Sequence, residues 1–183
     1  MKSTETLVLA GGCFWCTEAV FVCVKGVQTV ESGYANGQVP NPSYEAVCTG
    51  RTGYAEAIRV AFDPVVVPLE VLLDIFFATH DPTTLNRQGA DVGTQYRSGI
   101  YTTTEAQHAS VQTYMAQLKA DKVFAQPIVT EVEGLHNFYL AEPEHQNFYE
   151  RHPYHGYCMA VAGPKVDKLK HRFVAWVKDA STS

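Results

Sequence analysis

Hydrophobic and polar residues alternate along several short segments in the first third of the chain, a pattern typical of β-strands. The segments 6–10 and 27–34 are predicted to be two such strands. A third is predicted over 56–62, where the even-numbered residues share one face and all of them except Glu56 are apolar. The alternation therefore places the carboxyl group of Glu56 on a face that the fold is expected to bury.

Helical periodicity characterises the segments between and after these strands. Helices are predicted over 14–24 and 68–79, each with apolar residues at helical spacing. A third helix is predicted after Thr104, which forms with Gln107 the pattern of a capping box. A closing helix is predicted over 166–177, where charged and apolar residues alternate as on a helix that packs at the surface.

Two more strands are expected at 96–102 and 127–133, and the segment 137–154, rich in Tyr, His and Asn, is expected to be partly helical. Because strands and helices mix without strict strand–helix–strand alternation, the chain is predicted to be an α+β protein. The expected architecture is a two-layer α/β sandwich with a mixed sheet and a ferredoxin-like core. We expect one domain over residues 1–183, with a loop-rich C-terminal segment and a short tail at 180–183.

The composition narrows the possible functions. The chain has 183 residues, 46% of them hydrophobic, which is enough to build a core. A net charge of -5 without a long basic run provides no electrostatic footprint for nucleic acid. No apolar stretch approaches the roughly 20 residues of a membrane-spanning helix. We therefore expect a monomeric, cytoplasmic protein that binds neither nucleic acid nor a membrane.

The five cysteines are an odd number at low density, which argues against a framework of structural disulfides. Cys13 follows Gly11–Gly12 at the predicted start of a helix, where unpaired N–H groups and the helix dipole lower the pKa of a thiol. Cys16 lies three residues later, a spacing that permits a reversible disulfide. The same pair is compatible with two buried core thiols or with half of a zinc site. Cys23 and Cys48 are expected to pack without a chemical role.

Four sequence motifs follow one another along the chain: Gly12–Trp15, Pro42–Tyr44, Thr52–Glu56 and Gly93–Ser98. In order and separation these motifs resemble the A-type peptide methionine sulfoxide reductases, and the resemblance covers nearly the whole chain. Tyr157 and Cys158, followed by the segment 164–166, are similar to one branch of this family. Two positions depart from the family pattern, since Cys16 and Tyr54 stand where glycine and histidine are common.

The resemblance implies that Cys13 attacks the sulfur of an oxidised methionine and returns it to the thioether. Phe14 and Trp15 would form an aromatic wall against the methyl group of the substrate, and Asp91 would orient the substrate or structure its loop. The implied substrate is the S epimer of methionine sulfoxide, either free or in peptides and oxidised proteins.

The resemblance also places Glu56, Tyr44 and Tyr96 at the sulfoxide oxygen. A sulfoxide becomes a good electrophile only when its oxygen is protonated or strongly hydrogen-bonded. Glu56 is the candidate acid, because burial on an apolar strand face should raise its pKa. The two tyrosines would donate phenolic hydrogen bonds to the charge that develops on the oxygen.

After the attack, Cys13 is left as a sulfenic acid, which a second thiol can condense to a disulfide. We predict that Cys16 is this resolving thiol because it is nearest in sequence, with Cys158 as the rival. A thioredoxin would then reduce the disulfide, a role that dithiothreitol can take in vitro. The chemistry requires neither a bound organic cofactor nor a metal.

Three other functions are compatible with parts of the pattern. A zinc-binding module could combine His152, His155 and Cys158 with the cysteine pair at the start of the first helix. A general thiol–disulfide oxidoreductase could use the same cysteine pair, but this function gives no reason for the accompanying carboxyl and phenol groups. A binding protein for oxidised methionine would use the aromatic residues after Cys13 and would need no cysteine pair.

Overall fold

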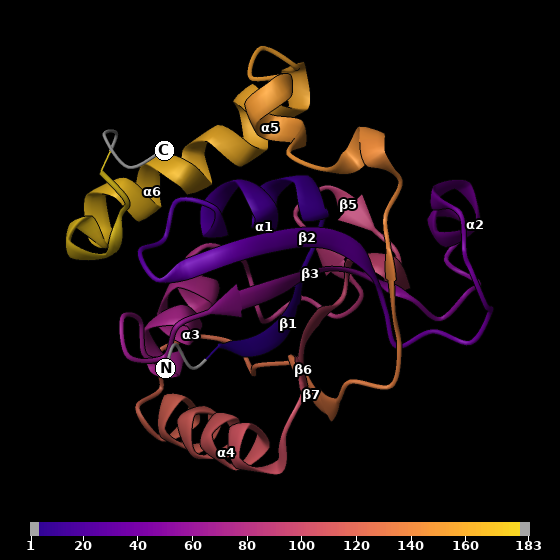
Figure 1. Ribbon diagram of the computed structural model, residues 1–183. Helices are drawn as coiled ribbons and strands as arrows, with labels where there is room; N and C mark the ends of the chain where they lie inside the picture. The colour runs from indigo at the N-terminus through magenta and orange to yellow at the C-terminus, as the bar shows by residue number, and fades with distance from the viewer. Residues whose placement is uncertain (1–3, 180–183) are drawn as a thin grey trace.

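The central feature of the structure is a six-stranded sheet (Figure 1). The computed structural model describes residues 4–179, so the tail predicted at 180–183 lies outside the described residues. In spatial order the strands are β7 (Glu131–Gly134), β6 (Ser98–Thr102), β1 (Glu5–Gly11), β3 (Ala55–Phe62), β2 (Val27–Ala35) and β8 (Phe138–Leu140). Neighbouring strands are antiparallel except β6 and β7, which are parallel, so the sheet is mixed.

The four middle strands and two helices form a ferredoxin-like core. Strands β1 and β2 are both antiparallel to β3, which lies between them, so they run in the same direction and are joined by the crossover helix α1 (Phe14–Phe21). Strand β3 leads through α3 (Leu69–Ala78) to β6, which pairs with the other edge of β1. This topology confirms the predicted α+β fold with a mixed sheet.

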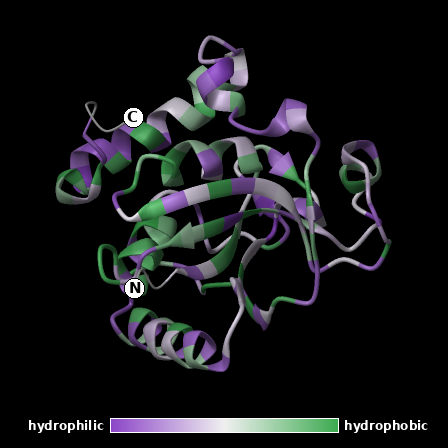
Figure 2. Ribbon diagram, in the orientation of Figure 1, coloured by the Kyte–Doolittle hydropathy of each residue, from purple (hydrophilic) through white to green (hydrophobic). Residues whose placement is uncertain are grey.

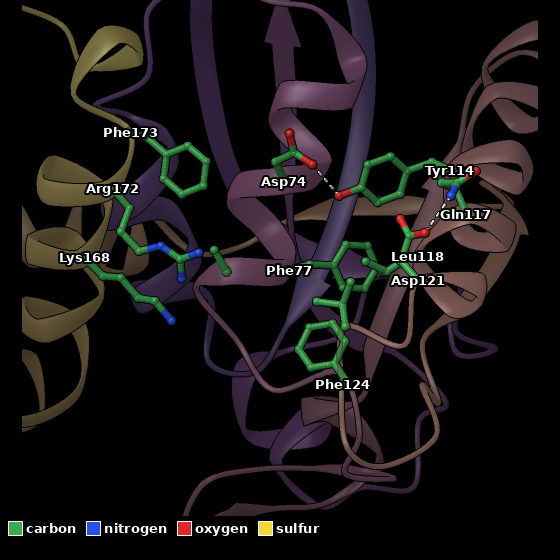
Figure 3. Close-up of a pocket in the computed structure, with 12 residues that line it drawn as sticks. Asp74, Phe77, Tyr114, Gln117, Leu118, Asp121, Phe124, Lys168, Arg172 and Phe173 are labelled. Atoms are coloured by element: carbon green, nitrogen blue, oxygen red, sulfur yellow. Dashed lines mark hydrogen bonds between the residues drawn. The ribbon is translucent and has the colours of Figure 1, made fainter.

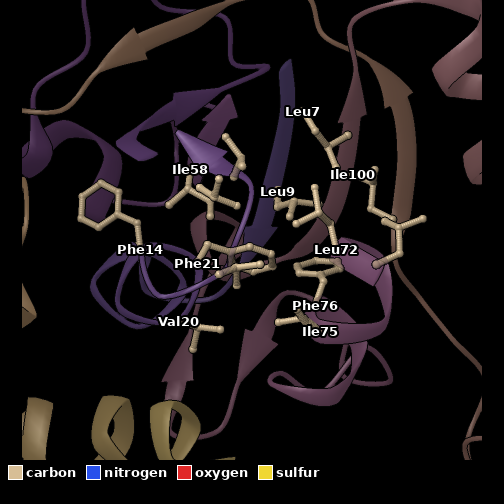
Figure 4. Packing of buried hydrophobic residues seen from close by; sticks show 14 of the residues in the cluster. Leu7, Leu9, Phe14, Val20, Phe21, Ile58, Leu72, Ile75, Phe76 and Ile100 are labelled. Carbon is tan, nitrogen blue, oxygen red and sulfur yellow. The ribbon is translucent and has the colours of Figure 1, made fainter. Parts of the chain in front are cut away.

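One face of the sheet carries the helices and the main hydrophobic core. Side chains of α1, α3, α4 (Glu105–Ala120) and α6 (Gly163–Arg172) form one buried cluster with apolar residues of that face (Figure 4). Figure 2 shows that α3 is largely hydrophobic, whereas α6 presents many hydrophilic positions. The opposite face holds a smaller cluster, formed by Val8, Ala10, Ala35, Ala55, Ala57 and Tyr101. The helices therefore form one layer against the sheet, as the two-layer prediction requires.

Short elements connect these parts and carry several of the predicted site residues. Ser43 begins the first of them by accepting a hydrogen bond from the backbone N–H of Ala46 at 3.1 Å. The elements are α2 (Tyr44–Cys48), β4 (Arg87–Gln88), β5 (Asp91–Val92), η1 (Thr94–Tyr96), η2 (Pro143–His145), α5 (Phe148–Arg151), the π-helical η3 (Cys158–Ala162) and η4 (Val174–Trp176). Two of them, η2 and α5, give the predicted partly helical character to the segment 137–154, which also contains the unpredicted strand β8.

The first helix is shorter than predicted, since α1 ends at Phe21 and not at Val24. The backbone N–H groups of Cys23 and Val24 donate to carbonyls only three residues earlier, which tightens the chain into a turn. Val24 then forms an isolated antiparallel bridge with Val177. A long-range pairing thus replaces the last turn of the predicted helix.

Three other predicted boundaries are wrong. Tyr96 lies in the 3-10 turn η1, and the strand that follows begins only at Ser98. The segment 127–130 is not a strand, and the N–H of Val129 donates outside the sheet to the carbonyl of Pro82. The closing helix α6 spans 163–172, because Phe173 leaves the helical conformation with a φ of -124°.

Candidate active site

Cys13 stands at the junction between the central strand β1 and helix α1, as its N-cap residue. The chain turns sharply at Gly12, whose φ of +97° lies in the left-handed region and whose added Cβ would be 2.6 Å from the Gln88 side chain. The Cys13 side chain is partly exposed, whereas Cys16 is buried one turn later. Both thiols are free, and they lie close enough for each to shift the pKa of the other. The predicted cysteine pair therefore exists as two adjacent thiols.

The two thiols differ in acidity. The hydrogen bond with Cys16, burial and the neighbouring Glu56 raise the pKa of Cys13 well above its ordinary value. The hydrogen bond from Cys13 lowers the pKa of Cys16 to about 7, with a further contribution from the positive charge of Lys165. The prediction of a lowered Cys13 pKa is therefore wrong. The backbone N–H of Trp15 does lower it, but burial and the partner thiol outweigh this effect.

Glu56 lies on β3 opposite Tyr34 of β2, and its side chain is only 1% exposed. The backbone N–H of Phe14 donates to Glu56 Oε1 at 3.2 Å. The second oxygen, Oε2, is buried without a hydrogen-bond partner. Burial, followed by the charges of Asp91 and Cys16, raises the pKa of Glu56 to about 8. The predicted apolar environment and raised pKa are thus present, and one carboxyl oxygen is left open.

Tyr44 and Tyr96 approach Glu56 from two loops that lie far apart in sequence. Tyr44 begins α2, where its backbone N–H donates to Glu142 Oε2 at 2.9 Å. Tyr96 ends the turn η1. Burial and the charge of Glu56 raise the pKa of both phenols, which are therefore neutral hydrogen-bond donors at physiological pH. The structure thus places both predicted tyrosines around the same carboxyl group.

Aromatic rings border the cysteine on the side of the C-terminal segment. Trp15 stacks on Phe148 with ring centroids 3.7 Å apart and an interplanar angle of 5°. The indole N–H of Trp15 also donates to His145 Nδ1 at 3.2 Å. The His145 ring lies 4.3 Å from that of Tyr44 and 5.6 Å from that of Phe14. Neither His145 nor Phe148 is predicted from the sequence, where the only signal is the Tyr- and His-rich composition around them.

Asp91 is connected to the cysteine pair through Tyr157. The Tyr157 hydroxyl donates to Asp91 Oδ2 at 2.6 Å, and the Cys16 thiol donates to the same hydroxyl with a sulfur–oxygen distance of 3.7 Å. Cys158, the next residue, is fully buried, and burial raises its pKa, with a smaller contribution from the charge of Cys16. All predicted site residues therefore lie around one helix start.

A groove of about 750 Å³ lies elsewhere, between α3, α4 and α6 (Figure 3). Three phenylalanines, Phe77, Phe124 and Phe173, help to line it, and Asp74 in its wall accepts a hydrogen bond from Tyr114 at 2.6 Å. No residue of the Cys13 site lines this groove. The size of a cavity therefore does not locate the thiol chemistry in this molecule.

Within the described range, 4–179, no three or more His, Cys, Asp or Glu side chains are grouped as they would be to hold a metal ion. None of the helices in this part of the chain has the length and apolar character needed to cross a membrane.

Comparison with known proteins places the chain in a family. The family model described as peptide methionine sulfoxide reductase matches residues 5–176. The chain is 56% identical over 169 residues to the peptide methionine sulfoxide reductase MsrA of Deinococcus radiodurans, an alignment that covers 92% of this chain and 82% of that protein.

Solved structures give the same result. Mxr1 from Saccharomyces cerevisiae in reduced form is similar with a TM-score of 0.77 and 36% identity, over 85% of this chain and 89% of that one. Mxr1 in complex with Trx2 is similar with a TM-score of 0.54 and 26% identity, over 79% of this chain and 84% of that one. The family match, the sequence identity and the shared fold agree, and the chain belongs to the peptide methionine sulfoxide reductase family.

Proposed function

We propose that this protein reduces methionine S-sulfoxide to methionine, with Cys13 as the nucleophile and Glu56 as the acid. One observation carries the assignment of these roles. Glu56 bonds the N–H of Phe14, the residue next to Cys13, through one oxygen, while its other oxygen is buried without a partner. A buried, protonated carboxyl group with a free oxygen is suited to hydrogen-bond the oxygen of a sulfoxide that enters beside the thiol.

The side chains around Cys13 and Glu56 would form the binding site for the substrate. The sulfoxide oxygen would point toward Glu56 Oε2 and receive hydrogen bonds from the phenols of Tyr44 and Tyr96. The methyl group would lie against the rings of Phe14 and Trp15. Asp91, which accepts the hydroxyl hydrogen bond of Tyr157, would hold this side of the site in place. The sulfoxide oxygen would thus contact polar groups, and the methyl group would contact aromatic rings. This difference allows the site to select one epimer.

The first step transfers one oxygen from the substrate to the enzyme. Cys13 passes its proton to the hydrogen-bonded Cys16, whose pKa of about 7 permits a thiolate at neutral pH. The Cys13 sulfur then attacks the sulfoxide sulfur while Glu56 donates its proton to the oxygen. The hydroxyl group then moves from the substrate sulfur to the Cys13 sulfur as the bond between the two sulfurs breaks. Methionine leaves with its thioether restored, and Cys13 keeps the oxygen as a sulfenic acid. The carboxylate left on Glu56 recovers a proton from solvent.

The second step forms a disulfide. The Cys16 sulfur attacks the sulfur of the Cys13 sulfenic acid, and the hydroxyl group leaves as water after taking up a proton. Cys16 is favoured for this role because its thiol interacts with that of Cys13, whereas Cys158 is fully buried. Peptide mapping after one turnover should find a link between residues 13 and 16. A link between 13 and 158 would instead assign the role to Cys158.

A thioredoxin is proposed to reduce the disulfide and release the dithiol enzyme, as the complex of the related Mxr1 with Trx2 suggests. Dithiothreitol should replace it in vitro, and no bound cofactor is needed. The proposed substrates are oxidised proteins, peptides and free methionine sulfoxide, so the enzyme would repair oxidative damage. We further propose that it works in the cytoplasm as a single-domain monomer, which suits a protein with five free thiols.

The test incubates pre-reduced protein with a racemic peptide methionine sulfoxide and excess dithiothreitol. The wild type should convert about half of the substrate, since one epimer is used, and Cys13→Ser should convert none. Cys23→Ser is the matched control, because this thiol donates to the carbonyl of Ala19, packs at the edge of the core and should be dispensable for the reaction. Equal conversion by wild type and Cys13→Ser would refute the role of Cys13.

A further inference from the structure

Glu18 is a second buried carboxyl group that the proposed reaction does not use. It lies in α1, five residues after Cys13, and only 2% of its surface is exposed. The Ser32 hydroxyl donates to Glu18 Oε2 at 3.2 Å. The backbone N–H groups of Asn147 and Phe148 lie close enough to the carboxyl group to lower its pKa. Glu18 therefore ties the catalytic helix to a segment about 130 residues away in sequence.

The bonded segment, His145–Phe148, is held in a defined conformation. Asn147 has a φ of +53°, in the left-handed region that costs energy for a residue other than glycine. The Gln146 side chain binds the backbone of Ser32 at both groups, accepting from its N–H at 2.9 Å and donating to its carbonyl at 2.8 Å. Gln146 also donates to the carbonyl of Ala141 at 3.0 Å. The segment is thus fixed to strand β2 on one side and to helix α1 on the other.

The two ends of this segment hold Trp15 between them. His145 accepts the indole hydrogen bond at 3.2 Å, and Phe148 stacks on the indole ring at 3.7 Å. The N-cap residue of α5, Asn147, makes no side-chain cap hydrogen bond. The carboxyl group of Glu18, from helix α1, is the acidic group close to the N–H groups at the start of this short helix. Removing that acceptor would release the N–H groups that set the position of Phe148.

We infer that Glu18 is a positioning residue that keeps Phe148 stacked on Trp15 and thereby shapes the wall against which the substrate methyl group binds. The inference rests on the proposed function only in assigning that wall to the substrate. A carboxylate suits this task because its two oxygens accept hydrogen bonds from several donors at once. A glutamine of the same shape has one acceptor oxygen, and its amide N–H groups would face a backbone N–H.

The experiment compares Glu18→Gln, Phe148→Ala and the double variant in steady-state kinetics with a peptide methionine sulfoxide. Glu18→Gln should raise KM by about five- to tenfold and leave kcat within about twofold, since it weakens substrate binding without touching the reacting groups. In the Phe148→Ala background, Glu18→Gln should have no further effect on KM. The stacking of Phe148 on Trp15, through which Glu18 is inferred to act, is already absent there.

A fluorescence measurement reports on the segment without any turnover. In a Trp176→Phe background, Trp15 is the remaining tryptophan, and Glu18→Gln should shift its emission in the same direction as Phe148→Ala. Ser32→Ala is the matched control, because it removes the hydroxyl hydrogen bond of Glu18 and leaves both neighbouring N–H groups in place. It should lower the midpoint of urea unfolding without changing KM or the Trp15 emission.

An unchanged KM and unchanged Trp15 emission in folded Glu18→Gln would overturn the inference. So would an equal rise of KM with and without Phe148, since Glu18 would then act elsewhere. If the wild type proved inactive, the proposed function would fail, while the emission shift would still decide whether Glu18 positions the segment.

Discussion

Glu56 and Glu18 are two buried carboxyl groups whose surroundings differ in hydrogen bonding. Burial raises the pKa of Glu56 to about 8 and that of Glu18 to about 7. Glu18 accepts a hydrogen bond from the Ser32 hydroxyl, and the backbone N–H groups of Asn147 and Phe148 lie close enough to lower its pKa. Glu56 accepts from one backbone N–H, and its Oε2 has no partner. The two residues are thus alike in burial and in the direction of their pKa shift. They differ because Glu56 has a carboxyl oxygen without a hydrogen-bond partner.

This difference indicates what separates a candidate acid from a structural anchor. An unsatisfied buried polar atom costs free energy, typically about 1–3 kcal/mol, so a fold retains it where something else compensates. At Glu56 the compensation would be the hydrogen bond to the substrate oxygen. At Glu18 every donor belongs to the protein, and the group joins α1 to the C-terminal segment. A raised pKa alone would not have distinguished these roles.

The largest expected effect that tests this comparison is on kcat. Glu56→Gln should lower kcat by about 10²- to 10⁴-fold, because the amide cannot donate an acidic proton to the sulfoxide oxygen. It should remain folded, since its carbonyl oxygen can still accept the N–H of Phe14. Single-turnover methionine formation and circular dichroism measure the two properties. A kcat within threefold of wild type would remove Glu56 as the acid.

The second effect is on stability as a function of pH. The Glu56 pKa is raised from 4.5 to about 8, so the protonated form is favoured in the fold. The associated stabilisation is complete below pH 4.5 and is lost as the pH rises through 8, by up to roughly 5 kcal/mol. Glu56→Gln cannot ionise, and its free energy of unfolding relative to wild type should rise over this pH range.

Urea unfolding at pH 5 and pH 8.5 measures this difference. Glu18→Gln provides the contrast. The pKa of Glu18, about 7, is raised less than that of Glu56, so the pH-dependent gain of this variant should be smaller. An equal pH-dependent gain in both variants would mean that the fold disfavours the two carboxylates to the same degree, contrary to the difference in their pKa.

The third effect concerns the donors on the open side of Glu56. Tyr44→Phe and Tyr96→Phe should each lower kcat by about tenfold to a hundredfold, because each removes one hydrogen bond to the developing charge on oxygen. Tyr101→Phe is the matched control. Its hydroxyl donates to Glu131 at 2.8 Å in the smaller cluster of the sheet, and its loss should leave kcat unchanged. Equal losses in all three variants would indicate a general effect on folding.

The parts of the site that local pattern could predict are those built on β1, α1 and β3. Strand alternation placed Glu56 on an apolar face, and the glycines before Cys13 marked the start of a helix. The direction of the Cys13 pKa could not be predicted, because it depends on the hydrogen bond with Cys16 and on burial beside Glu56. A position at a helix N-terminus accounts for only one contribution among several.

The wall formed by the C-terminal segment could not be predicted because its contacts are non-local. Trp15 meets His145 across 130 positions, and no periodicity relates them. The anchor Glu18 does leave a signal, since it is an acidic residue in the otherwise apolar helix α1. Its meaning depends on the N–H groups of Asn147 and Phe148, which only the folded chain brings to it.

The smallest of the expected effects is on the pH dependence of kcat/KM, which reports groups in the free enzyme. Activity should increase as the pH rises through about 7, where Cys16 becomes able to accept the proton of Cys13. It should fall above about pH 8, where Glu56 ionises, by about tenfold per pH unit. Single-turnover assays avoid the separate titration of the reductant. The falling limb should stay near pH 8 in Glu18→Gln and disappear from the residual activity of Glu56→Gln. If the falling limb of the pH profile shifted in Glu18→Gln instead, the essential proton would belong to Glu18. The roles of the two carboxyl groups would then be reversed.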